Sequence, residues 1–159
     1  MAAVVVAADR AAGADRMAVK QTASSQTEVA VRSHLRRELE THLDGLGYTF
    51  VRRMHRAGEP VAEIARVSPV RGRLVYGETV VRSDLRRRQC HERLQHFSHR
   101  RTRRRTAILL FIAVAEDCRE DLEAVLVEIG IRGALRGGNV HVVSVASPPK
   151  KRTPRAATR

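Results

Sequence analysis

Two glutamates, Glu63 and Glu78, lie in neighbouring segments that read as short strands, and carboxylates placed in this way can share a cation. Arg71-Gly72 predicts a two-residue turn between the segments, so Glu78 faces Ala65 and Glu63 faces Val80. The two glutamates are then diagonal neighbours on one face of the sheet, within about 7 Å at the backbone. Such a pair could hold Mg²⁺ for phosphodiester hydrolysis. The alternative is that both are surface carboxylates or partners of nearby arginines.

The highest density of charge in the chain is in residues 82–105. This segment contains ten arginines and only two acidic residues, Asp84 and Glu92. A helix dipole accounts for one or two cations near a helix end, but not for this number. A surface that follows phosphate groups accounts for them better. The residues predicted to contact nucleic acid are Arg86, Arg87, Arg88, Arg93, Arg100, Arg101, Arg103, Arg104 and Arg105.

Other chemistry finds little support in the sequence. Cys90 and the histidines that follow it have none of the paired short spacings of a structural zinc site. The motifs GxxxxGK[ST] and GxSxG are both missing, so no sequence motif supports nucleotide hydrolysis or serine-hydrolase chemistry.

Composition points in the same direction as the arginines. The chain has 159 residues and a net charge of +13, and nucleic acid, with DNA preferred, is the expected partner. The absence of Trp, with only two Tyr and three Phe, disfavours a single-strand binder built on stacked rings. Two cysteines 28 residues apart fit a reducing compartment, and no apolar segment reaches the length of a membrane span, so we expect a cytoplasmic protein.

The apolar pattern predicts one domain over residues 25–146, between an Ala-rich disordered leader (1–24) and a disordered basic tail (147–159). The leader contains Met17, a second possible start. Within the domain the pattern predicts helices over 25–44, 83–99 and 118–129, and strands over 48–54, 61–67, 73–81, 107–115 and 140–145. The class is therefore α/β with a mixed sheet, in the order α-β-β-β-α-β-α-β.

Over about residues 27–145 the chain resembles the PD-(D/E)xK, or restriction-endonuclease-like, nucleases. The sharpest part is Gly72-Arg-Leu-Val-Tyr-Gly-Glu78-Thr-Val80, which is similar to the family's third strand, where an apolar run delivers an acid, one spacer and a lysine. Glu78 stands at the position of the acid, but Val80 replaces the lysine, and the chain has no Pro-Asp pair on the preceding strand.

The resemblance implies a restriction-endonuclease-like fold and a Mg²⁺ site in which Glu63 replaces the missing aspartate beside Glu78. The family's lysine orients the attacking water and offsets charge in the transition state, and valine can do neither. Arg82, two residues farther along the same face, is the candidate to supply charge as a third catalytic residue, although its pKa rules out proton transfer.

Three functions remain open from the sequence. The first is a nucleic-acid-binding protein with a nuclease-like fold and a decayed catalytic site, which needs no cofactor. The second is an active Mg²⁺-dependent endonuclease that uses Glu63 and Glu78, with an arginine in place of the lysine. The third is a basic protein-interaction or assembly factor that uses its arginines on acidic partners.

Overall fold

The computed structural model describes the backbone of residues 7–51, 58–70 and 72–147, and side chains from residue 26 onward. In chain order, the elements are α1 (Ala7–Gly45), β1 (Thr49–Phe50), β2 (Ile64–Val67), β3 (Leu74–Val80), η1 (Arg82–Arg86), α2 (Arg88–Ser98), β4 (Leu109–Ala115), η2 (Glu116–Cys118), α3 (Arg119–Glu128), η3 (Ala134–Arg136) and β5 (Val140–Val145), where η denotes a 3₁₀ helix. Apart from residue 147, the tail predicted at 147–159 lies outside the described residues.

The strands form one five-stranded sheet in the order β1-β2-β3-β4-β5. The first three strands pair antiparallel, whereas β3, β4 and β5 run parallel. The prediction of an α/β domain with a mixed sheet is confirmed at this level. Because β3 takes part in both kinds of pairing, it is the strand where the meander meets the parallel half of the sheet.

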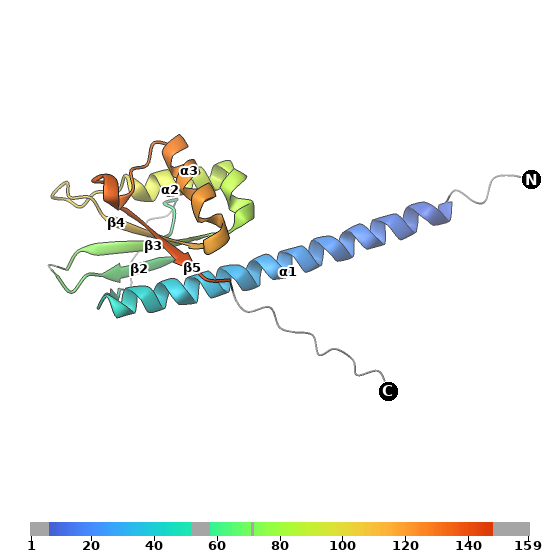
Figure 1. Cartoon of the computed structure of the whole chain (residues 1–159), viewed down its shortest axis with the longest axis horizontal. Helices are drawn as coiled ribbons and strands as arrows, with labels where there is room; N and C mark the ends of the chain where they lie inside the picture. The colour runs from blue at the N-terminus through green and yellow to red at the C-terminus, as the bar shows by residue number, and fades with distance from the viewer. Residues whose placement is uncertain (1–6, 52–57, 71, 148–159) are drawn as a thin grey trace, which may run out of the picture.

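Helices cover both faces of the sheet (Figure 1). Leu35, Leu39 and Leu43 of α1 pack in one apolar cluster with Phe111 and Ala113 of β4. On the other face, the apolar side chains of α2 and α3 pack in a second cluster with the alternate residues of β3 and β4. The unbroken apolar run at 107–115 predicts a strand buried on both faces, and β4 confirms that prediction.

Helix α1 begins much earlier than the sequence pattern indicates. The capping box at Ser25 predicts a start there, but α1 is helical from Ala7, and its N-terminal part extends past the sheet (Figure 1). The physical reason is propensity, because alanine is the best helix former and this segment is rich in it. The predicted boundary at residue 25 is therefore not a break in the helix.

The single helix predicted over residues 83–99 is two helices in the structure. Arg87 is extended, with φ −93° and ψ 120°, and separates η1 from α2. The Asp84 carboxylate accepts the backbone N–H of Val81 at 3.2 Å and the Arg87 guanidinium at 3.3 Å. These side-chain bonds hold the tight 3₁₀ turn, which a purely periodic reading of the apolar residues does not reveal.

The register of the β2–β3 hairpin differs from the prediction by two residues. Ile64 pairs with Gly77, and Ser68 donates its N–H to the Arg73 carbonyl at 2.7 Å, so the connection between the two strands is longer than two residues. The predicted two-residue turn is therefore wrong. The predicted pairs of Glu78 with Ala65 and of Glu63 with Val80 are therefore wrong as well, because Ala65 pairs with Tyr76 and β2 begins one residue after Glu63.

Among the helices that the structure describes, none has both the length and the apolar character needed to cross a lipid bilayer.

Candidate functional site

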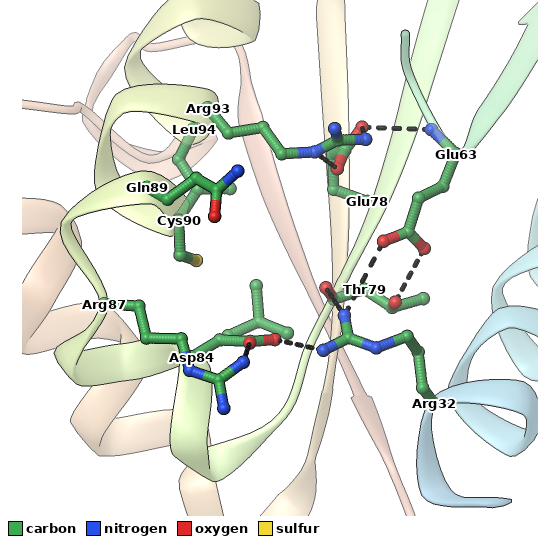
Figure 2. Close-up of a pocket in the computed structure, with 11 residues that line it drawn as sticks. Arg32, Glu63, Glu78, Thr79, Asp84, Arg87, Gln89, Cys90, Arg93 and Leu94 are labelled. Atoms are coloured by element: carbon green, nitrogen blue, oxygen red, sulfur yellow. Dashed lines mark hydrogen bonds and ion pairs between the residues drawn. The ribbon is translucent and has the colours of Figure 1, made fainter. Parts of the chain in front are cut away.

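A cavity of about 360 Å³ opens beside the second half of β3. Strand β2 begins at Ile64, opposite Gly77, so none of the described strands lies beside the last residues of β3 on that side. Helix α1 and the η1–α2 segment close the space from the two faces of the sheet (Figure 2). The charged residues that line it are Glu63, Glu78, Asp84, Arg32, Arg87 and Arg93, so formal charges balance within the cavity.

Glu78 is held by a two-point ion pair with Arg93 of α2. The carboxylate is 2% exposed, with Oε2 2.6 Å from Arg93 Nε and Oε1 3.1 Å from Arg93 Nη2. The same Nη2 donates to the Val61 carbonyl at 2.6 Å, and the Glu63 N–H donates to Glu78 Oε1 at 3.1 Å. Burial raises the pKa of the Glu78 carboxyl, and the Arg93 guanidinium opposes that rise.

The neighbouring Gly77 allows the sheet and α1 to approach closely at this point. A Cβ on Gly77 would lie 3.0 Å from Ile64 Cβ and 3.1 Å from Leu39 Cδ2. This close approach explains why a glycine stands inside a strand. From the sequence alone, the same glycine could equally mark the close approach of a bound ligand.

The Glu63 carboxylate lies at the other side of the strand edge. Its Oε2 accepts the Thr79 hydroxyl at 2.6 Å, and its Oε1 lies 3.7 Å from Arg32 Nη1 of α1. Alternation along β3 directs Thr79 toward α1 and Glu78 toward α2, as Figure 2 shows. The two glutamates line one cavity, but different arginines hold their carboxylates on opposite faces of the sheet, so the prediction that the two side chains share one face is wrong.

Asp84 is the third acid of the cavity, and no local sequence pattern places it beside the two glutamates. Its Oδ2 lies 2.7 Å from Arg32 Nη2, which makes Arg32 a bridge between Asp84 and Glu63. Arg32 Nη1 also donates to the Thr79 carbonyl at 3.2 Å. No local sequence signal could have found Arg32, because its partners lie 47 and 52 residues away.

The residues of this cavity do not fit a Mg²⁺ ion as they stand. A shared cation would have to displace Arg93 from Glu78, and both Thr79 and Arg32 from Glu63. Val80, at the family's lysine position, is 1% exposed and packs in the core. Within the described part of the chain, no group of three or more His, Cys, Asp or Glu residues could hold a metal. Magnesium binding therefore stays a prediction from the sequence.

Arg82 lies apart from the two glutamates. Its Nη2 donates to Asp117 Oδ2 at 3.1 Å, and it does not line the cavity. The structure therefore does not bring Glu63, Glu78 and Arg82 together as one catalytic set. Cys90 does line the cavity, but burial raises its pKa to about 11, so the thiol stays protonated at neutral pH.

The nine arginines predicted to contact nucleic acid divide into two groups. Four form ion pairs with acids: Arg87 with Asp84, Arg88 with Glu92, Arg93 with Glu78 and Arg100 with Glu59. The other five are exposed and form no ion pair with any residue that the structure describes: Arg86, Arg101, Arg103, Arg104 and Arg105. Four of these five belong to one loop, between α2 and β4.

That loop, which we call the arginine hairpin, spans residues 101–107. Arg101 and Ala107 form an antiparallel bridge, and the Thr102 N–H donates to the Thr106 carbonyl at 2.9 Å. Arg103, Arg104 and Arg105 occupy the tip, where Arg105 has φ 61°. The third residue of such a loop is left-handed and usually glycine, because a side chain there costs about 1 kcal/mol or more.

No family model, curated protein or solved structure matches the chain. The structure combines a charge-balanced cavity, in which every acid is bound by an arginine, with a separate hairpin whose arginines are unpaired among the described residues.

Proposed function

We propose that this protein binds nucleic acid through the phosphate backbone and does not cleave it. The fold in this proposal is restriction-endonuclease-like, and the compartment is the cytoplasm, where Cys90 and Cys118 stay as free thiols. The partner is duplex DNA, because the chain has too few aromatic residues to stack on a single strand.

The observation that carries the proposal is the tip of the arginine hairpin. Exposed arginines in proteins commonly bind a nearby acid, as Arg88 and Arg119 do here with Glu92 and Glu123. Arg103, Arg104 and Arg105 lie side by side with no such partner among the described residues, and Arg105 occupies a strained conformation. Mutual repulsion and strain both cost stability, and a polyanionic ligand would offset both.

The absence of cleavage in the proposal rests on the cavity beside β3. The two glutamates that would hold a metal are already neutralised by guanidinium groups, and Val80 supplies no ammonium for a transition state. An arginine can stabilise negative charge but does not transfer a proton at neutral pH. These residues therefore act as structural ion pairs that tie α1 and α2 to the edge of β3.

One assay tests both halves of the proposal. A fluorescently labelled duplex DNA, a duplex RNA and a single strand are each titrated with the protein in Mg²⁺ or Mn²⁺, and the recovered nucleic acid is then run on a denaturing gel. We expect duplex binding with intact strands. Cleavage by the wild-type protein that is abolished in Glu78→Ala would overturn the non-cutting half, and failure to bind any of the three would overturn the binding half.

A further inference from the structure

A second cavity, of about 340 Å³, lies at the end of the domain where β4 and β5 begin. Its walls come from the C-terminal end of α2, the base of the arginine hairpin and the segment between α3 and β5. In Figure 1 the hairpin loop projects from this same end of the sheet, far from the N-terminal part of α1. None of its lining residues belongs to the cavity beside β3.

The charge of this second cavity is one-sided. Arg101 and Arg132 both line it, and neither forms an ion pair with a described residue. No aspartate or glutamate is among its described lining residues, in contrast to the three acids of the first cavity. A hollow lined by two arginines without an ionic partner among the described residues, and by no acid, is suited to a small anion, and guanidinium matches phosphate oxygens in geometry.

His99 adds a third donor or acceptor at the rim. Its Nδ1 lies 2.8 Å from the Gln95 carbonyl, which fixes the ring through a bond within its own helix. The other nitrogen, Nε2, is then the ring atom left for a ligand.

The walls of the cavity are fixed by backbone contacts and not by the arginines themselves. A Cβ on Gly138 would lie 1.9 Å from the Arg132 carbonyl oxygen, so only glycine fits there. The Gly138 N–H donates to the Gly133 carbonyl at 3.0 Å. Asn139 Nδ2 donates to the carbonyls of Ser98 and Ile108, which ties this segment to α2 and to the strand that follows the hairpin. The hollow therefore exists before any ligand binds.

We infer that this cavity is a phosphate-binding site, with Arg101 and Arg132 as the two guanidinium ligands and His99 at the rim. Arg101 is also the first residue of the arginine hairpin, so a phosphate in the cavity and phosphates at the hairpin tip can belong to one polyanion. The inference rests on the proposed function only for the source of the phosphate. That source is either an internal phosphodiester or a terminal phosphomonoester of the nucleic acid.

The site itself is tested without nucleic acid. Inorganic phosphate is titrated into the full chain at low ionic strength and followed by calorimetry and by amide NMR shifts. We expect Arg132→Ala and Arg101→Ala each to weaken phosphate binding by at least about tenfold. Arg37→Ala is the matched control, because Arg37 is an exposed arginine of α1 that lines neither cavity. Arg132→Lys should retain part of the affinity, since it keeps the charge but loses the fork.

The source of the phosphate is tested with three DNA duplexes: 5′-phosphorylated, 5′-hydroxyl and circular. Tighter binding of the phosphorylated ends that disappears in Arg132→Ala assigns a terminal group, whereas equal loss of affinity for all three assigns a backbone phosphate. Absence of phosphate binding in the wild type, or equal effects of Arg132→Ala and Arg37→Ala, would overturn the inference. Phosphate binding without any duplex binding would sustain the site and refute the proposed function instead.

Discussion

The guanidinium of Arg93 contacts both carboxylate oxygens of Glu78, with Nε 2.6 Å from Oε2 and Nη2 3.1 Å from Oε1. This pair fastens α2 to β3 across the mouth of the cavity, and it occupies the acid that the nuclease resemblance assigns to a metal. Its energetic role can be separated from any catalytic role by substitution.

Arg93→Ala should destabilise the domain, because it leaves the buried Glu78 carboxylate without its charged partner. Breaking such a pair costs about 3–5 kcal/mol when both partners are buried, and we expect about 2–3 kcal/mol here since Arg93 is partly exposed. Denaturant unfolding measures the change. The control is Arg88→Ala, whose exposed pair with Glu92 should matter by less than about 1 kcal/mol. Equal effects of the two variants would contradict a structural role for the Arg93–Glu78 pair.

Glu78 should also make stability depend on pH in a definite direction. Burial raises its pKa above the ordinary 4.5, against the pull of Arg93. A carboxyl with a raised pKa binds its proton more tightly in the folded protein, so its contribution to stability is present below the unfolded pKa and is lost as pH rises through the folded pKa. The free energy of unfolding of the wild type minus that of Glu78→Gln should therefore fall as the pH rises above the ordinary pKa of 4.5. A rise over this range would mean that Arg93 outweighs burial.

The centre of the fold is tested at Leu110, which is fully buried in β4. Leu110→Asp should abolish cooperative unfolding or shift it far from the wild-type midpoint, because an unpaired buried charge costs several kcal/mol. Leu135→Asp makes the same chemical change at a fully exposed position and should leave the midpoint nearly unchanged. Circular dichroism during thermal unfolding gives both values. A native-like transition in Leu110→Asp would refute the placement of β4.

Arg105 offers a test in which stability and binding should move in opposite directions. Its φ of 61° favours glycine, so Arg105→Gly should stabilise the domain by up to about 1 kcal/mol while it weakens binding to a duplex. Arg104→Gly removes the same charge without relieving a positive φ, and should weaken binding with no gain in stability. Destabilisation by Arg105→Gly would show that the loop does not hold the strain inferred from its backbone.

Local pattern was enough to predict the regular elements that bury an apolar stripe. The four-residue spacing of Leu35, Leu39 and Leu43 predicts the buried face of α1, and the apolar run at 107–115 predicts β4. The last strand, expected at 140–145, has those bounds in β5. In each case the signal lies within the element itself, so no distant partner is needed to read it.

Contacts between residues that lie far apart in the sequence could not be predicted from local pattern. The hairpin register depends on the length of the connection between β2 and β3, and a two-residue turn at Arg71-Gly72 was the wrong choice. The cavity depends on Arg32, whose partners Thr79 and Asp84 are set by the packing of α1 on the sheet. The arginine run was visible as charge, but only the fold divides it into ion-paired residues and the unpaired hairpin.

Phosphate binding by the arginine hairpin is tested by the salt dependence of duplex DNA binding for a triple variant of the hairpin tip. Each phosphate neutralised on B-DNA adds a slope of about −0.9 to a plot of log affinity against log salt. Replacing Arg103, Arg104 and Arg105 with alanine should therefore make the slope shallower by up to about 2.7. The matched control replaces three arginines outside the hairpin, Arg36, Arg37 and Arg119, and should change it by less than about 1. A wild-type slope in the hairpin variant, with the fold intact, would show that the hairpin tip does not contact phosphate groups.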